Sequence, residues 1–433
     1  MVKVTPLGGV AEVTNNLFVY ETEKEALVVD CGAGFPEEEE GENKILIPDF
    51  AYLQTIRKKL RGLIITHAHF DHYGAIPYLL EQFNLPVFGV RISLEFLRAK
   101  MIDLKIKKET KLQQLSFRKN VSLGSWQITP FLVNHSVPDA SGLAISTPAG
   151  KIFHVSDFKF DLTPVDGRVF DFQSCIQLAQ SGVLALFSDC LGACEEGFTQ
   201  TEKKVGQTLF SLMAKAPGQL LMTTLSSNIH RLRLMIEAAR VLGRQIVPVG
   251  RSIETSLAIG ERLGYLPRLS RKKQKNSRRL VYLVAGSYGQ ENSNLMRVAQ
   301  GKHPGLKLEK GATVIFSADP SPPNTEAKVN KLVDLLTLQG ARVHYYEIQE
   351  NLHASGHGSA GDLQLLMALV KPKFFVPIGG CPRHMRAYAA LAKEMGIGPE
   401  RVFELLPGES LIFGLHSARR GTVIELKKKT ILV

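Results

Sequence analysis

The chain has 433 residues, of which 44% are hydrophobic, and a formal net charge of +12 at pH 7. This length suffices for about three domains, and the composition is typical of a packed globular protein. No apolar run reaches the roughly 20 residues of a membrane-spanning helix, and the first residues lack the layout of a signal peptide. We therefore expect a cytoplasmic protein, without a membrane span, that favours polyanionic partners.

Short apolar runs separated by turns fill the first 160 residues and predict a sheet-rich α/β sandwich. Helices are expected after residue 75 and near 92–104. The predicted strands cover residues 17–20, 26–30, 63–65, 87–90, 126–128, 143–146 and 152–155.

Four side chains that can bind metal follow the predicted strand 63–65, namely His67, His69, Asp71 and His72. In extended backbone, His67 and His69 point to the same side. Asp71 and His72 lie at the turn into a helix and can face a second ion. Nitrogen and carboxylate oxygen without thiolate suit zinc or manganese with a position open to water. The alternative, a chance cluster of surface histidines, does not explain the strand before the cluster or the helix after it.

A two-metal hydrolase also needs a third histidine and a carboxylate that bridges both ions. His135 follows an apolar run and Asp157 ends a predicted strand, so both are candidates. Asp30 ends the strand 26–30 and is expected to accept hydrogen bonds from a ligand imidazole or from loop amides. Because a single Asp after a strand is more often a turn residue, the role of Asp30 depends on the whole constellation.

From about residue 200, longer helices alternate with strands, a pattern that indicates a parallel, doubly wound domain. Strands return after residue 349. The predicted helices lie near 202–215 and 232–242 and begin again at 321–324, and the predicted strands lie at 219–223, 246–249 and 374–378.

Positive charge and sulfur are unevenly distributed along the chain. Residues 268–279 hold seven basic side chains in twelve positions, and residues 98–119 interleave basic with apolar side chains. Either stretch could be a solvated face, but beside a metal site they favour a phosphodiester partner. The five cysteines follow no regular spacing, which favours reduced thiols. Cys190 and Cys194 are a weak metal signal, and buried thiols are the simpler interpretation.

These motifs together resemble the metallo-β-lactamase superfamily and, within it, the β-CASP ribonucleases of the ribonuclease J family. The resemblance covers nearly the whole chain and rests on many short motifs in the family's order: Leu7 to Val10, Phe35 to Asp49, His67 to His72, His135 to Asp139, Asp157 to Asp161, Thr163 to Gly167, Ser188-Asp189, Ser227 to Arg231, Gly250 to Ser252 and His353 to His357. It implies an α/β fold, a metallo-β-lactamase αββα sandwich with an inserted parallel α/β β-CASP domain. Residues 1–198 and 351–433 would form the first domain and 199–350 the second, with RNA in the cleft between them.

The resemblance also assigns the site residues by position. The first zinc would be bound by His67, His69 and His135, the second by Asp71 and His72, and Asp157 would bridge them. Asp71, Asp189 and His357 are expected to be catalytic, Asp189 as support for the site and His357 near the scissile phosphate. The residues expected to hold phosphates and the terminal nucleotide are Ser227, Asn228, His230, Arg231, Arg251, Ser252, His353, Ser355 and Gly356.

The implied function is hydrolysis of RNA with two Zn²⁺ ions, or with Mn²⁺, in RNA processing or decay. Both 5′-to-3′ exonuclease and endonuclease modes fit, and 5′-monophosphorylated single strands are the expected substrate. A second copy of the chain or a ribonuclease J-like paralogue is the expected protein partner. The chain ends soon after residue 429, so we expect the additional C-terminal domain of the family, which supports dimer contacts, to be absent or reduced.

The chain departs from the family where the strand 374–378 ends. The family continues into a histidine that completes the second zinc and then a glutamate, whereas here these positions are Gly379 and Cys381. Losing a ligand should weaken the second metal by at least the roughly 10- to 100-fold known for supporting residues. Three interpretations stay open: water takes the place of the histidine, the Cys381 thiolate binds instead, or the chain is an inactive paralogue that binds RNA as a regulatory subunit. A small-molecule hydrolase would leave the inserted domain and the basic stretches unexplained.

Overall fold

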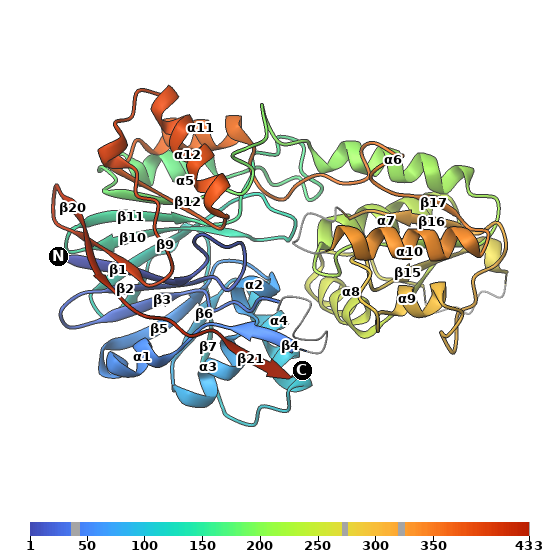
Figure 1. Ribbon diagram of the computed structural model, residues 1–433, viewed down its shortest axis with the longest axis horizontal. Coiled ribbons are helices and arrows are strands. Elements are labelled where there is room, and N and C mark those ends of the chain that lie inside the picture. Colours follow the sequence, from blue (N-terminus) through green and yellow to red (C-terminus); the bar gives the residue numbers. More distant parts are fainter. Residues whose placement is uncertain (36–43, 271–275, 319–324, 433) are drawn as a thin grey trace.

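The computed structural model describes residues 1–35, 44–270, 276–318 and 325–432. Figure 1 shows two bodies side by side. The larger body contains both ends of the chain and two stacked sheets, and the smaller contains a single sheet with helices. No helix in the described ranges is both long and apolar enough to span a membrane.

Two mixed sheets form the larger body. The first has the order β20-β19-β1-β2-β3-β5-β6-β7 and the second β18-β12-β11-β10-β9-β8. Their inner faces share one hydrophobic core, in which Phe18 and Ile64 of the first sheet pack with Phe187 of the second. The strands of the first sheet are β1 (Val2–Gly8), β2 (Leu17–Glu21), β3 (Ala26–Val29), β5 (Leu60–Ile65), β6 (Val87–Gly89), β7 (Leu112–Gln114), β19 (Glu409–Phe413) and β20 (Ala418–Val423). Those of the second are β8 (Val121–Leu123), β9 (Trp126–Leu132), β10 (Ser141–Thr147), β11 (Gly150–Val155), β12 (Ala185–Asp189) and β18 (Phe374–Ile378), and β4 (Lys44–Ile47) pairs separately with β21 (Lys429–Leu432).

Helices cover the outer faces of both sheets. Those of the first sheet are α1 (Ala51–Thr55), α2 (Phe70–Tyr73), α3 (Ile76–Gln82) and α4 (Arg91–Asp103), and those of the second are α5 (Phe172–Ala179), α11 (Ala360–Val370) and α12 (Pro382–Glu394). Leu363 of α11 and Met385 of α12 pack in one core with Phe375 of β18. Short 3₁₀ turns cover Arg57–Lys59, Ser277–Arg279 and Pro399–Arg401. This layering confirms the predicted αββα sandwich.

A five-stranded sheet with the order β14-β15-β13-β16-β17 forms the smaller body, and every pair in it is parallel. Its strands are β13 (Leu220–Thr223), β14 (Gln245–Val249), β15 (Leu280–Val284), β16 (Thr313–Phe316) and β17 (Arg342–His344). Its helices are α6 (Glu202–Lys215), α7 (Ile229–Val241), α8 (Arg251–Leu263), α9 (Asn294–Ala299) and α10 (Glu326–Leu338). The predicted parallel, inserted domain is therefore confirmed. The helix start expected at 321–324 and residues 271–275 of the basic stretch lie outside the described residues.

The chain leaves the larger body after β12 and returns to it just before α11, and the two connections lie side by side where Gly192 bridges Ser359. β12 and β18 are parallel neighbours, with Asp189 opposite Ile378. The strand ends before and after the insertion therefore lie together, which places Gly379 beside Asp189. The carboxyl end of β5 carries the histidine cluster on the neighbouring sheet.

Candidate metal centre

The histidine cluster is anchored by Asp30, at the end of β3. This fully buried residue adopts a left-handed backbone conformation, with φ 58°, which Asp tolerates better than most side chains. Its carboxylate accepts hydrogen bonds from the Thr66 amide, the Thr66 hydroxyl and His72 Nδ1, each at 2.8 Å. The expectation that Asp30 accepts hydrogen bonds from an imidazole and from a loop amide is thus confirmed.

The first metal position is formed by three imidazoles and one carboxylate. His69 Nδ1 lies 3.1 Å from His67 Nε2 and 2.9 Å from His135 Nε2. Asp157 Oδ2 lies 3.4 Å from His67 Nε2 and 3.5 Å from His135 Nε2. Tetrahedral zinc with bonds of about 2.0–2.1 Å separates its ligand atoms by about 3.3 Å. These four side chains therefore fit a zinc-like ion.

Each imidazole of this position has a partner on its other nitrogen. His135 Nδ1 donates to the Gly356 carbonyl at 2.7 Å, and His69 Nε2 lies 3.0 Å from the Ser136 hydroxyl. His67 Nδ1 lies 3.1 Å from the Thr66 hydroxyl. Such partners fix the tautomer and leave the opposite nitrogen lone pair facing the ion.

Burial keeps two of these imidazoles, His69 and His135, neutral. It lowers the pKa of His69 to about 3 and the pKa of His135 well below its usual value, and the neighbouring imidazoles add to both shifts. Burial opposes ionisation of Asp157, but His72 and His67 outweigh it and hold the pKa of Asp157 well below its usual range. Neutral imidazoles around an ionised carboxylate are a donor set for a cation.

The second metal position contains Asp71, His72 and Asp157. His72 Nε2 lies 3.4 Å from Asp71 Oδ2 and 3.3 Å from Asp157 Oδ1. Asp157 thus turns one oxygen to each position, as a bridging ligand does. The ligand atoms within each group lie within 4.8 Å of one another, so the His/Asp cluster could hold metal ions.

Gly379, which follows the carboxyl end of β18, contributes no side chain to this second position. Gly379 has φ +70°, and a Cβ at that position would lie 3.7 Å from Asp189 Oδ1. Cys381 caps the N-terminus of α12, where its sulfur accepts from the backbone of the third helical residue. Within the described ranges, Cys381 does not join the ligand atoms of Asp71, His72 and Asp157.

His357 and Asp189 form a pair at the edge of the centre. His357 Nδ1 lies 2.8 Å from Asp189 Oδ2, and its Nε2 lies 3.8 Å from Asp157 Oδ2. Burial lowers the pKa of His357, but Asp189 and Asp157 outweigh it and raise that pKa to about 9. Burial raises the pKa of Asp189 despite the attraction of His357.

The residues expected to bind phosphate lie in three different settings. Ser355 and Gly356 contact the metal centre, since the Ser355 hydroxyl accepts from the His357 amide at 3.0 Å and Gly356 binds His135. His353 lies two residues before Ser355 and is half-buried. Ser227, Asn228 and His230 lie where β13 leads into α7, and Arg251 and Ser252 begin α8.

Four of these side chains, all in the smaller body, are bonded within the protein. The Asn228 side chain caps α7 by accepting from the Arg231 amide at 2.8 Å, and the Ser252 hydroxyl lies 2.9 Å from that of Ser226. Arg251 is exposed and pairs with Asp103 of α4 at 3.2 Å. Arg231 is fully buried, and each of its guanidinium nitrogens binds protein acceptors. The structure therefore does not bring Arg231 to the surface where RNA would pass.

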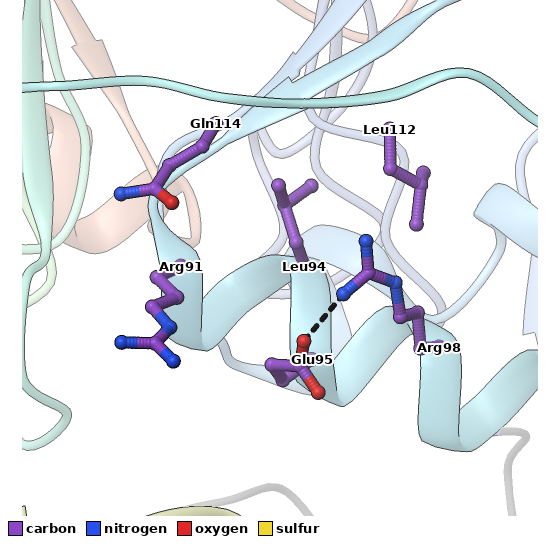
Figure 2. Close-up of a pocket in the computed structure, with 6 residues that line it drawn as sticks. All are labelled: Arg91, Leu94, Glu95, Arg98, Leu112 and Gln114. Carbon is purple, nitrogen blue, oxygen red and sulfur yellow. Dashed lines mark hydrogen bonds and ion pairs between the residues drawn. The ribbon is translucent and has the colours of Figure 1, made fainter. Parts of the chain in front are cut away.

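A surface cavity of about 240 Å³ lies beside the first residues of the basic stretch 98–119. Figure 2 shows Arg98 on α4 paired with Glu95 at this cavity. Glu95 also pairs with Arg262 of α8, so this part of α4 contacts the smaller body. The lining residues are Arg91, Leu94, Glu95, Arg98, Leu112 and Gln114. They include none of the predicted metal ligands, and we assign this cavity no part in the centre.

Three family models match successive parts of the chain. The metallo-beta-lactamase superfamily matches residues 10–171, the beta-CASP domain of ribonuclease J matches 217–336, and a Zn-dependent metallo-hydrolase RNA specificity domain matches 341–403. Fold, site and models define a metal-dependent class, the metallo-β-lactamase-fold proteins with an inserted β-CASP domain.

Similar proteins identify the family within this class. The chain is 36% identical to ribonuclease J of Synechocystis, over 100% of the chain and 66% of that relative. It is 35% identical to ribonuclease J 1 of Streptococcus pyogenes, over 96% of the chain and 75% of that relative. A solved protein of unknown function from Enterococcus faecalis aligns with a TM-score of 0.64 and 16% identity, over 94% of this chain and 99% of that one, which supports the fold alone. The chain belongs to the ribonuclease J family.

Ser136 and Asn16 contact the centre, but the sequence analysis assigned them no role. Ser136 orients His69, and Asn16 places its side-chain amide 3.1 Å from His72 Nε2. Ser136 directly follows His135, so its place in the motif offered a signal. Asn16 lies 55 residues from Asp71 in sequence, and only the pairing of β2 and β3 beside the loop brings it there.

Proposed function

We propose that this chain is a metal-dependent ribonuclease that hydrolyses RNA phosphodiester bonds. The observation that carries this proposal is the convergence of the ligand atoms of His67, His69, His135 and Asp157 in a chain of the ribonuclease J family. The first listed relatives are longer than this chain, which spans 66% of one and 75% of the other.

Zn²⁺ is the proposed ion at the first position, because three nitrogens and one oxygen with tetrahedral spacing suit it. Asp71, His72 and Asp157 would hold a second ion, Zn²⁺ or Mn²⁺. When bound, such ions supply positive charge to the phosphoryl oxygens and activate water at neutral pH. The side chains then hold the ions, orient the phosphate and move protons.

His357 is the proposed catalytic residue nearest the leaving oxygen. Its Nδ1–H donates to Asp189, which fixes the ring and directs Nε2 toward Asp157 and the metal centre. Against the effect of burial, Asp189 raises the pKa of His357, which favours a protonated ring that can stabilise negative charge or donate a proton to the leaving oxygen. Asp189 acts as its positioning partner, and Asp71 acts through the second ion.

RNA would reach this centre from the side of the smaller body. We assign phosphate and terminal-nucleotide binding to the other residues of the predicted set, through side chains or backbone amides: Ser227, Asn228, His230, Arg251, Ser252, His353, Ser355 and Gly356. Arg231 is left out because its charge is neutralised inside the protein. The net charge of +12 favours a polyanion, and we propose 5′-monophosphorylated single strands as the substrate. The proposed domain limits are 1–198 with 351–433, and 199–350.

The test is cleavage of RNA by the purified full chain with Zn²⁺ or Mn²⁺. Single-stranded RNA carrying a 5′-monophosphate, a 5′-triphosphate or a 5′-hydroxyl is labelled at its 3′ end, so that stepwise removal from the 5′ end is distinguished from internal cuts. We expect cleavage that prefers the monophosphate and is lost in Asp71→Ala. Asp334→Ala, at an exposed position of α10 outside the predicted site residues, is the control and should cleave normally. Salt-sensitive RNA binding without cleavage in either metal would contradict the proposal.

A further inference from the structure

The side-chain amide of Asn16 lies within the second metal position. Its terminal nitrogen is 3.1 Å from His72 Nε2 and 3.4 Å from Asp71 Oδ2. The proposed ligand atoms are separated from one another by nearly the same distances, 3.3 and 3.4 Å. Asn16 is 2% exposed, so this terminus is enclosed with the ligands. An atom with this spacing occupies the place of a further ligand around one ion.

Asn16 also adjoins the strand end where the resemblance expects the family's histidine. The Gly379 amide donates to the Gly9 carbonyl at 2.7 Å. A Cβ on Gly9, which has φ +74°, would lie 2.2 Å from Asn16 Oδ1. The absence of a side chain at Gly9 therefore makes room for the Asn16 amide. Gly379 and Asn16 contact the same residue.

We propose that Asn16 completes the second metal position with its amide oxygen, in the place of the side chain that Gly379 lacks. This inference rests on the proposed two-metal function and names a ligand that the sequence motifs do not include. Mn²⁺ and Mg²⁺ prefer oxygen ligands, such as amides and carboxylates, to thiolates or imidazoles. The second position therefore prefers a harder ion than the first.

The amide must turn its oxygen toward the ion, and its surroundings make this turn inexpensive. Amide oxygen and nitrogen are assigned from the hydrogen-bond network. Without an ion, the nitrogen faces the acceptors Asp71 O at 3.1 Å and Val13 O at 3.3 Å. After the turn, Asp71 O keeps the hydrogen bond from the Asn16 backbone amide at 3.1 Å. Val13 is half-buried, so water can replace its lost partner.

The test measures metal binding in the absence of RNA. The full chain is stripped with a chelator and given one equivalent of Zn²⁺, and Mn²⁺ is then titrated while free Mn²⁺ is followed by electron paramagnetic resonance. Asn16→Asp presents an oxygen in either orientation, and we expect it to bind the second ion at least about 10-fold more tightly. Asn16→Leu, of similar size but without a donor atom, should bind it at least about 10-fold more weakly.

Asn15→Asp is the matched control. It adds the same charge one residue away, where the side chain contacts Glu12 and Thr14 instead of Asp71 and His72, and we expect a change in affinity of less than about threefold. Thermal unfolding in chelator verifies that each variant is folded. The proposal is overturned if Asn16→Asp weakens the second ion, as loss of an N–H donor would, or if Asn16→Leu leaves its affinity unchanged. Because no RNA is present, Asn16-dependent Mn²⁺ binding in a chain that does not cut RNA would contradict the proposed function alone.

Discussion

Two buried clusters of charged groups, the metal centre and the surroundings of Arg231, are built in opposite ways. Around Arg231, the guanidinium binds both oxygens of Glu202 at 2.9 Å and the Ser317 hydroxyl at 2.8 Å. It also donates to the Leu352 carbonyl at 3.1 Å. Every group in this cluster has a partner of the opposite kind, as a buried ion pair requires.

The metal centre, in contrast, brings together groups that cannot satisfy one another. Ring nitrogens of His67, His69 and His135 converge, since His69 Nδ1 lies 3.1 Å from His67 Nε2 and 2.9 Å from His135 Nε2, and the low pKa of His69 and His135 disfavours a second proton on either of these two rings. Both clusters are conspicuous in sequence, but the metal centre, unlike the surroundings of Arg231, has a donor set for an added cation. Predicted chemistry should therefore be assigned to buried groups whose donor atoms converge at metal-ligand distances, and not to those closed in an ion pair.

The largest expected effect comes from the carboxylate that the two metal positions share. Asp157→Asn replaces one charged oxygen with an amide and removes the bridge, so we expect binding of both ions to weaken by more than about 100-fold and RNA cleavage to fall to background. Metal content after dialysis and cleavage rate measure this. Asp166→Asn, whose carboxylate pairs with Arg168, is the control. If Asp157→Asn kept two ions, Asp157 would not be a shared ligand, and the proposed contrast between a cation-binding centre and a closed ion pair would be wrong.

Breaking the Arg231 cluster should affect stability and leave metal binding unchanged. Glu202→Gln leaves the guanidinium charge buried without its counterion, and we expect a loss of about 3–5 kcal/mol in the free energy of unfolding. Urea denaturation followed by circular dichroism measures it. Glu237→Gln, in the half-exposed pair with Arg233, should cost less than about 1 kcal/mol. A folded, fully stable Glu202→Gln that binds RNA poorly would instead favour a phosphate-binding role for this cluster.

The parts of the site that lie on continuous motifs were predictable. His67, His69, Asp71 and His72 follow a strand whose buried pattern is visible in the sequence, and strand-to-helix geometry directs them to one place. Asp30 was predictable for the same reason, since it ends the neighbouring parallel strand. The layers of both bodies followed equally from hydrophobic periodicity.

Contacts between distant segments were not predictable from periodicity. Arg231 lies next to Asn228 and His230 in the motif, but helix α7 turns its side chain inward, toward Glu202 on α6. Asn16 lies at the second metal position because its loop packs against Asp71, whose backbone carbonyl accepts a hydrogen bond from the Asn16 side chain. In both cases the direction of one side chain, set by tertiary packing, decides the role.

The pH dependence of stability should distinguish the two clusters further. Burial raises the pKa of Glu202, but Arg231 and Lys159 outweigh it and lower that pKa to about 2. Because the folded pKa is depressed, the stabilisation is complete above the unfolded value of about 4.3 and is lost as pH falls toward 2. The difference in unfolding free energy between wild type and Glu202→Gln should therefore be constant from pH 7 to 5 and decrease by up to about 1.4 kcal/mol per pH unit below 4. A difference that stays constant down to pH 3 would contradict the ion pair.

The smallest predicted effect concerns the support of His69 by Ser136. The Ser136 hydroxyl lies 3.0 Å from His69 Nε2, and Ser136→Ala removes the group that orients the ring while leaving all four ligand atoms in place. We expect the affinity for the first ion to fall by about 10-fold, measured by competition with a chromophoric zinc chelator. Ser174 is equally buried, at 6% exposure, and its hydroxyl bonds Asp171, away from the metal centre. Ser174→Ala should therefore leave zinc affinity unchanged, and equal losses in both variants would mean that general loosening, and not orientation of His69, weakens the site.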